Sequence, residues 1–357
     1  MKYVLTALAA AAIAFLAASL LVREREAKRP PASGTFERRF PDETAAYRRP
    51  AAWDARWKEA RGHAWSIKDR DETDPEGDPR WNRVLAGRPR LRPLPAACLA
   101  CHAAAGTAGA ATYYEARDRK PLGCADCHDR QGDLRSAVCA QCHREYYVGS
   151  GGEAAFPEGR SADEIEAFYQ RRGFGDWMNA ATGAVVLKAQ HPQFEMNAQG
   201  PHARAGVGCA DCHMPFERRG ATRIADHRAT LPLANIGRAC LSCHRETADE
   251  LRARAQEIQQ RTLALLSRAE DALVAAIDAI QTAQAAGARV EPALKLETMA
   301  QWRIDFVAAD RSKGFHAPQE SARLLAEAID YARRAQLDAV LGRTGRDHKT
   351  TAADERR

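Results

Sequence analysis

The last third of the chain carries apolar residues at the spacing of one face of an α-helix. After Glu246 they recur at intervals of three, four and seven residues, which predicts a long amphipathic helix that ends near Gly287. The apolar positions are Leu251, Ile258, Leu265, Leu266, Leu273, Ile277 and Ile280. A second helix is expected from Pro292 to Asp310, and a third from Ala317 to Leu341.

The other long apolar pattern lies at the N-terminus. Lys2 precedes an almost unbroken apolar run from Tyr3 to Val22. About 20 apolar residues span a bilayer, whereas a cleaved signal peptide usually has a shorter apolar region and a clear small-residue cleavage site. We expect residues 1–22 to be a membrane anchor or signal peptide, with the anchor favoured. Residues 23–50, rich in Arg, Pro and Glu, are expected to be a linker, and residues 342–357 a polar tail.

Composition favours a mainly helical protein, because alanine is abundant and strand-forming residues are scarce. The formal net charge of +6 arises from arginines scattered among Glu and Asp, without basic runs. This pattern is typical of a solvated surface and gives no indication of nucleic-acid binding.

All ten cysteines occur in C-x-x-C pairs, and a histidine directly follows each pair. C-x-x-C-H is the attachment signature of c-type haem, in which two thiols bond to the porphyrin and the histidine reaches the iron. Zinc sites need paired knuckles and leave these histidines unexplained. The sequence therefore predicts five covalently bound haems c and no disulfide. The motifs are Cys98, Cys101 and His102; Cys124, Cys127 and His128; Cys139, Cys142 and His143; Cys209, Cys212 and His213; and Cys240, Cys243 and His244.

The motifs are close together along the chain. Ten residues separate His128 from Cys139, and 26 separate His213 from Cys240. Such short connections predict haems near enough for electron hopping, and the porphyrins then supply part of the apolar core.

The predicted fold class is a mainly α multihaem cytochrome c with five covalently bound haems and long C-terminal helices. We expect a single domain over residues 51–341, in which the haem core at 51–244 carries the packed helices of 245–341. Because haem c is attached outside the bacterial cytoplasmic membrane, we expect a periplasmic protein, with any anchor oriented N-terminus inward.

Histidines outside the motifs supply candidates for the remaining axial positions. Five haems have ten axial positions, of which the motif histidines fill five. The six other histidines are His63, His191, His202, His227, His316 and His348. His348 lies in the polar tail and is set aside. If the other five all ligate iron, the protein is an electron carrier; if one does not, one iron is open and the protein is an enzyme.

Several stretches around these motifs occur in a characteristic order. They are R-G-H-A-W-S at 61–66, C-A-Q-C-H-R-E-Y-Y at 139–147, K-A-Q-H-P at 188–192, G-P-H at 200–202, C-A-D-C-H-M-P at 209–215, D-H at 226–227, C-L-S-C-H at 240–244 and W-R-I-D-F-V-A-A-D-R-S-K-G-F-H-A-P-Q-E at 302–320. Together they resemble the pentahaem, ammonia-forming cytochrome c nitrite reductases, from about Arg61 to Leu341.

The resemblance implies a distal ligand for four of the haems. His63 corresponds to the ligand of the third haem, His227 to that of the second, His316 to that of the fourth and His202 to that of the fifth. The first haem, on Cys98, Cys101 and His102, is then the open catalytic one.

The resemblance also implies an active site and a calcium site. His191 and Tyr146 match the family's active-site histidine and tyrosine. Glu145 and Gln190 would bind one Ca²⁺ through side-chain oxygens, and Tyr146 and Lys188 through backbone carbonyls, a hard-oxygen set that suits this ion. From spacing alone, His191 equally suits a cap on the first haem. A surface carboxylate is the alternative for Glu145, although the matches at Lys188 and Gln190 favour calcium.

The chain departs from the common family pattern in three places. The first haem motif is C-L-A-C-H, whereas the best-known members have C-x-x-C-K; a histidine-bearing subgroup is more similar. The insert between the second and third motifs is shorter than in long members. The substrate-binding arginine is expected about twenty residues before the first proximal ligand, where Arg83 stands and Arg88 and Arg90 compete.

The implied function is the six-electron reduction of nitrite to ammonium. Arg83 would hold the anion by charge-assisted hydrogen bonds, while His191 and Tyr146 would assist proton delivery. A multihaem electron conduit without a substrate site, or a reductase of hydroxylamine or sulfite, remains the alternative. Expected partners are nitrite, a membrane quinol-oxidising cytochrome or another electron donor, and a second copy of the chain in a homodimer.

Overall fold

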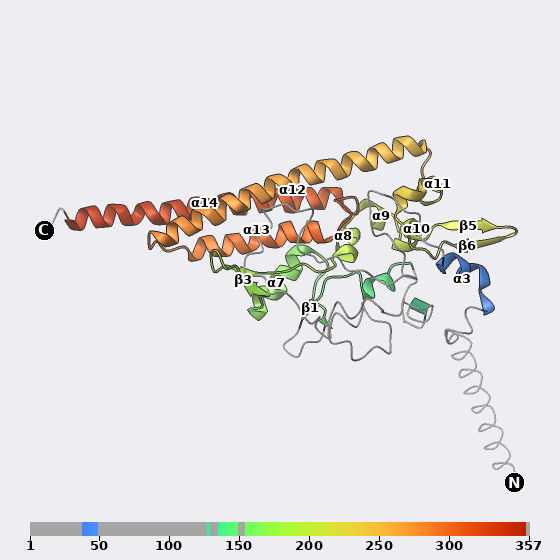
Figure 1. The fold of residues 1–357 in the computed structure, drawn as a ribbon, viewed down its shortest axis with the longest axis horizontal. Coiled ribbons are helices and arrows are strands. Elements are labelled where there is room, and N and C mark those ends of the chain that lie inside the picture. The colour runs from blue at the N-terminus through green and yellow to red at the C-terminus, as the bar shows by residue number, and fades with distance from the viewer. Residues whose placement is uncertain (1–37, 49–126, 129–134, 149–153, 355–357) are drawn as a thin grey trace, which may run out of the picture.

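The computed structural model of the protein describes residues 38–48, 127–128, 135–148 and 154–354 (Figure 1). The expected anchor, most of the expected linker and the first haem motif lie outside these ranges. So do Cys124, His63 and Arg83.

Three long helices form the C-terminal part of the described chain. They are α12 (Ala248–Ala285), α13 (Glu291–Ala309) and α14 (Pro318–Asp354). Helix α13 runs back along α12, and α14 turns again to lie beside both, so that the C-terminus is at the far end of the bundle (Figure 1). The Thr247 side chain caps α12 by accepting a hydrogen bond from Glu250 N–H, while the Glu250 carboxylate accepts one from Thr247 N–H.

The third helix is longer than expected from the sequence. It reaches Asp354, whereas its apolar periodicity fades near Leu341. Beyond this point the chain contains no proline, and glycine costs a helix only about 1 kcal/mol relative to alanine. Helical geometry therefore continues into the region expected to be a polar tail.

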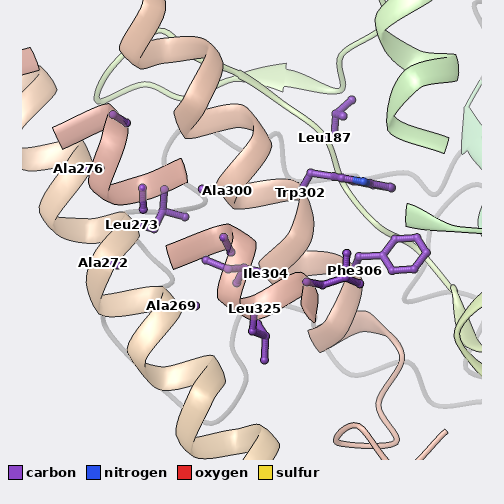
Figure 2. Packing of buried hydrophobic residues seen from close by; sticks show 14 of the residues in the cluster. Leu187, Ala269, Ala272, Leu273, Ala276, Ala300, Trp302, Ile304, Phe306 and Leu325 are labelled. Atoms are coloured by element: carbon purple, nitrogen blue, oxygen red, sulfur yellow. The ribbon is translucent and has the colours of Figure 1, made fainter. Parts of the chain in front are cut away.

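Small side chains let the bundle helices approach closely. Ala269, Ala272 and Ala276 of α12 are fully buried, as are Ala328 and Ala332 of α14. Larger residues such as Leu273, Trp302 and Phe306 fill the space around them (Figure 2). This alternation of small and large side chains is what native packing density requires.

The bundle is attached to the preceding region through α7 (Ala162–Arg172). Trp302 Nε1 donates to the Ala162 carbonyl at 3.0 Å, and Arg303 Nη1 donates to Glu166 at 2.8 Å. Both residues belong to the W-R-I-D-F stretch of α13, so this stretch fixes α13 against α7.

Short elements make up the rest of the described chain. The three sheets are antiparallel pairs, β1 with β2, β3 with β4 and β5 with β6. The elements are α3 (Pro41–Arg48), η2 (Cys139–Gln141), β1 (Tyr147–Val148), β2 (Ala154–Ala155), β3 (Trp177–Met178), β4 (Val185–Val186), α8 (Gln193–Gln199), α9 (Pro201–Arg204), α10 (Cys209–His213), β5 (Phe216–Arg219), β6 (Thr222–Ala225), η3 (Pro232–Asn235) and α11 (Ile236–Ala239). The expected mainly helical fold is confirmed. Within the described helices, none carries an apolar stretch long enough to cross a bilayer.

Candidate functional site

The three C-x-x-C-H motifs that are described in full each form one helical turn. His143 N–H donates to the Cys139 carbonyl at 2.8 Å, and His244 N–H donates to the Cys240 carbonyl at 2.9 Å. The fourth motif is the short helix α10. Residues three and four apart lie on the same face of such a turn, so both thiols and the imidazole point to one side. This is the donor set that covalent haem attachment requires.

Three of the expected histidine pairs stand at the separation of two imidazoles that share one iron. A metal–nitrogen bond of about 2 Å on each side, plus half a ring, places the two centroids about 6 Å apart. The pairs are His128 with His227 at 6.2 Å, His213 with His316 at 6.4 Å and His202 with His244 at 6.2 Å. These are the partners that the resemblance implies for the second, fourth and fifth haems. Their role as ligands stays a prediction, and the geometry is compatible with it.

The third and fourth motifs lie against each other. Cys209 N–H donates to Ser136 Oγ at 3.1 Å, and Ala210 N–H donates to the Arg135 carbonyl at 2.8 Å. A hydrogen bond between the thiols of Cys139 and Cys209, together with burial, raises the pKa of Cys139. The attachment points of two haems are therefore neighbours, as short-range electron transfer requires.

His191 lies between the third motif and α8. Its ring stacks on Tyr146 with centroids 6.0 Å apart and an angle of 26° between the ring planes. Its ring centroid is also 6.4 Å from that of His143. The two segments are joined at the backbone, because Phe194 N–H donates to the His143 carbonyl at 2.9 Å. The structure thus brings together the two expected active-site side chains of the described region.

The buried side chain of Glu145 connects the same two segments. Its side chain is fully buried, and its Oε2 accepts a hydrogen bond from Gln190 N–H at 2.7 Å. Its own N–H donates to Glu195 Oε2 at 3.1 Å. Oε1 makes no hydrogen bond within the described residues, although the Tyr169 hydroxyl interacts with the carboxylate.

Burial and nearby carboxylates dominate the electrostatics around Glu145. Burial raises the pKa of the Glu145 carboxyl well above its ordinary value, and the nearby Glu195 and Asp305 carboxylates add to this. The Gln190 N–H and the Lys188 ammonium act in the opposite direction. Burial likewise raises the pKa of Glu195.

Polar residues of α13 hold the segment that carries Lys188, Gln190 and His191. Asp305 Oδ2 accepts from Ala189 N–H at 2.8 Å, and its Oδ1 accepts from Lys188 Nζ at 3.3 Å. One turn earlier, Gln301 Oε1 accepts from Leu187 N–H at 3.2 Å. The sequence analysis assigned no role to either residue. The available signal was the i, i+4 spacing of polar residues in an otherwise apolar helix.

The structure describes hydrogen bonds of three of the four expected calcium ligands. Lys188 N–H donates to Asp176 at 2.7 Å, and Gln190 N–H donates to Glu145 Oε2 at 2.7 Å. In the part of the chain that is described, no three His, Cys, Asp or Glu side chains converge as a metal-binding group. A site there would therefore depend on carbonyl and amide oxygens as well.

Known proteins resemble this chain over most of its length. A cytochrome c-552 of Parabacteroides distasonis is 35% identical over 322 residues, which cover 78% of this chain and 64% of the relative. A cytochrome c-552 of Bacteroides fragilis is 40% identical over 250 residues, which cover 61% of this chain and 51% of the relative. The chain thus spans between half and two thirds of the length of these relatives.

A solved structure is similar in fold. The catalytic subunit of the cytochrome c nitrite reductase of Desulfovibrio desulfuricans, which has two calcium sites, matches with a TM-score of 0.58 and 29% sequence identity. The match covers 64% of this chain and 58% of the other. It confirms the resemblance found from the motifs.

The cytochrome c552 family matches residues 44–134 and 130–356, and so includes every cysteine motif and every candidate ligand histidine. Covalent haem c is therefore supported by the family as well as by the folded motifs. The chain belongs to the cytochrome c552 family.

Proposed function

We propose that the protein reduces nitrite to ammonium at an open haem c, and that four further haems, each held by two histidines, supply the electrons. The observation that carries this proposal is the stack of His191 on Tyr146 beside the buried Glu145. A histidine and a tyrosine held together at the edge of a haem core provide two groups that hold or donate protons.

The reaction needs many protons and electrons at one place. Reduction of nitrite consumes six electrons and eight protons, and yields ammonium and two water molecules. An open haem iron supplies the binding position for nitrogen and the electrons. His191 would hydrogen-bond a substrate oxygen and pass on a proton, and the Tyr146 hydroxyl would donate to partly reduced species. Arg83, outside the described residues, would hold the anion by charge-assisted hydrogen bonds.

We further propose that one Ca²⁺ binds next to this pair. Glu145 Oε1, buried and without a hydrogen bond in the described chain, fits a missing cation. The Gln190 side-chain oxygen and the carbonyls of Tyr146 and Lys188 would complete an all-oxygen set. The similar nitrite reductase structure has two calcium sites, which supports this assignment. The ion would neutralise Glu145 and fix the segments that carry Tyr146 and His191.

The cellular setting follows from the same reasoning. Haem c attachment supports a periplasmic location, where a membrane quinol-oxidising cytochrome or another donor would reduce the protein. A homodimer is supported by apolar side chains exposed in the second half of α14, with Leu337 and Leu341 each more than half accessible.

A second function, an electron conduit without a substrate site, is favoured by one distance in the structure. The 6.4 Å between the rings of His143 and His191 equals the separation in the His213–His316 pair. If His191 ligated the third haem in place of His63, its catalytic role would be lost. The backbone contact of Phe194 with His143 accounts for this proximity without ligation, so the enzyme is preferred.

EPR and turnover of the holoprotein separate these functions. For the enzyme, nitrite alters the signal of one haem, and His191→Ala lowers nitrite turnover by about 10²- to 10⁴-fold with all haems unchanged. Gln199→Ala, at the end of α8, serves as the control and should retain activity. A new high-spin haem in His191→Ala without nitrite would instead identify His191 as a ligand. Parallel assays with hydroxylamine and sulfite test the substrate.

A further inference from the structure

The turn between α13 and α14 has an unusual backbone. Arg311 and Lys313 have φ angles of 59° and 55°, in the left-handed region, and Gly314 follows at 83°. Residues other than glycine rarely adopt such angles, and each costs roughly 1 to 3 kcal/mol. A Cβ on Gly314 would lie 2.2 Å from Thr262 Oγ1, so the turn is also pressed against α12. Contacts made by the turn must hold this conformation in place.

Those contacts centre on the carboxylate of Asp310. Its Oδ1 accepts a hydrogen bond from His316 Nδ1 at 2.6 Å, and its Oδ2 accepts one from the Ser312 hydroxyl. Ser312 Oγ in turn accepts from His316 N–H at 3.1 Å. The turn therefore places the Asp310 carboxylate against the His316 imidazole, although the two residues are six positions apart in the sequence.

The stability of α13 does not explain why a buried carboxylate lies at its C-terminal end. Asp310 is the C-cap residue of α13, where the partial negative charge of the helix end disfavours an anion. Its side chain has no exposed surface, so water does not offset the cost of burying the charge. A buried anion at a helix C-terminus needs a partner elsewhere, and here that partner is His316.

The opposite side of the imidazole faces the fourth haem motif. With Nδ1 bonded to Asp310, Nε2 is the nitrogen left for a metal, and the His316 ring lies 6.4 Å from that of His213. Cys209, which opens this motif, is close enough to interact with His316. Asp310 therefore hydrogen-bonds the far side of a candidate iron ligand, a position from which carboxylates alter the basicity of the ligand and the reduction potential of the metal.

Other candidate ligands have different partners. His213 Nδ1 lies 3.1 Å from the Thr230 carbonyl, and His227 Nδ1 lies 2.8 Å from the Ala225 carbonyl. These partners are neutral. His244 Nδ1 has Glu246 at 3.7 Å, too far for a hydrogen bond, and both side chains are about two-fifths exposed, so water screens that charge.

We propose that Asp310 lowers the reduction potential of the haem held by His213 and His316 below those of the two other haems whose histidine pairs are described. The inference rests on the axial role proposed for His316. A buried carboxylate draws the Nδ1 proton toward itself and makes the imidazole a stronger donor, which stabilises ferric over ferrous iron. In the low dielectric of the interior this effect is not screened.

Such a potential has a consequence for electron flow. Cys139 and Cys209 bring the third and fourth motifs together, and Cys212 interacts with Cys240 of the fifth. The fourth haem would thus lie between two neighbours. At a potential below that of the fifth haem, it would pass its electron to that haem whenever the fifth is oxidised. It would act as a step that keeps electrons on the fifth haem.

Potentiometric titration of the holoprotein, followed by visible and EPR spectra, tests this inference. Asp310→Asn keeps the shape and an acceptor oxygen but removes the charge, so the midpoint potential of the low-spin haem whose signal is lost in His316→Ala should rise. Asp310→Glu retains the charge and should keep that midpoint low. Asp330→Asn removes the same charge from the exposed face of α14 and should leave every midpoint unchanged.

Two further variants keep the outcome decisive. Ser312→Ala removes the hydroxyl that donates to Asp310, so the carboxylate acts more strongly on His316 and the same midpoint potential should fall. This variant tests the inference even if Asp310→Asn does not fold. His316→Ala should convert one low-spin haem to high spin; if all low-spin signals persist, the axial role itself is wrong. If that signal is lost but Asp310→Asn and Ser312→Ala leave the midpoint unmoved, the inference about Asp310 is overturned while the axial role stands.

Discussion

The imidazole planes of His128 and His227 lie within 22° of parallel, at a ring separation of 6.2 Å. The two other pairs are close to perpendicular, at 67° for His213 with His316 and 72° for His202 with His244. Parallel axial imidazoles split the iron d orbitals strongly and give a rhombic low-spin EPR spectrum. Perpendicular planes leave two orbitals nearly degenerate and give a signal dominated by one large g value.

The first prediction follows from this difference. His227→Ala should remove a rhombic low-spin signal from the oxidised holoprotein and leave the large-g signals in place. Low-temperature EPR provides the measurement. Thr222→Ala, in the β5–β6 hairpin that precedes His227, is the control and should not change the spectrum. Loss of a large-g signal in His227→Ala would show that His227 serves another haem.

The second prediction concerns the buried carboxylate at the proposed calcium site. Glu145→Gln should abolish calcium binding, because it removes the anionic ligand, and should lower nitrite turnover as the Tyr146 and His191 segments lose their common anchor. Calcium is measured by elemental analysis after dialysis, together with the haem content. Glu297→Gln, at another buried carboxylate, should retain the metal. Unchanged calcium in Glu145→Gln would rule out this ligand.

Much of the helical bundle could be predicted from periodicity alone. Helix α13 begins and ends within two residues of its expected positions. Helix α12 begins and ends close to the positions expected for it. Each has one continuous apolar stripe, and a helix that must bury one stripe is the case that periodicity resolves best. The extension of α14 past Leu341 has no such stripe, which is why the pattern did not predict it.

The site was predictable only where short motifs define it. The K-A-Q-H-P stretch pointed to His191, and the structure places it beside Tyr146. Asp305 and Asp310 were not singled out, because their roles depend on partners. Asp305 bonds to Ala189, 116 residues earlier, and Asp310 meets His316 only through a left-handed turn. Contacts of this kind arise from tertiary packing and leave no periodic signal.

The third prediction tests the ionic link between α7 and the bundle. Arg303, almost fully buried, pairs with Glu166 at 2.8 Å and with Glu327 at 2.8 Å. Arg303→Ala leaves Glu166 buried without its main partner, which should lower the free energy of unfolding by about 3 to 5 kcal/mol. Denaturant unfolding of the holoprotein, followed by far-UV circular dichroism, measures this.

An exposed arginine on α14 provides the comparison. Arg334 pairs with Asp330 at 3.3 Å in water, and Arg334→Ala should cost no more than about 1 kcal/mol. The double variant Arg303→Met with Glu166→Leu removes both buried charges and should recover most of the lost stability. Equal losses in Arg303→Ala and Arg334→Ala would contradict a special role for the buried pair.

The fourth prediction concerns Glu297, on the face of α13 toward Thr182. Burial raises the pKa of its carboxyl from 4.5 to about 7, although the hydrogen bond from the Thr182 hydroxyl acts to lower it. Below pH 4.5 the carboxyl is neutral in both the folded and the unfolded protein, so it has no effect on stability. As the pH rises toward 7, the unfolded chain ionises first, and the free energy of unfolding falls.

Glu297→Gln removes this penalty, because the amide is neutral at every pH and similar in shape to the protonated carboxyl. The variant should be close to the native protein in stability at pH 4 and more stable by about 3 kcal/mol above pH 7. Glu291→Gln, exposed in the first turn of the same helix, should show no such gain. Denaturant unfolding at several pH values measures the difference, and a gain that is the same at pH 4 and pH 8 would show that Glu297 ionises normally in the folded protein.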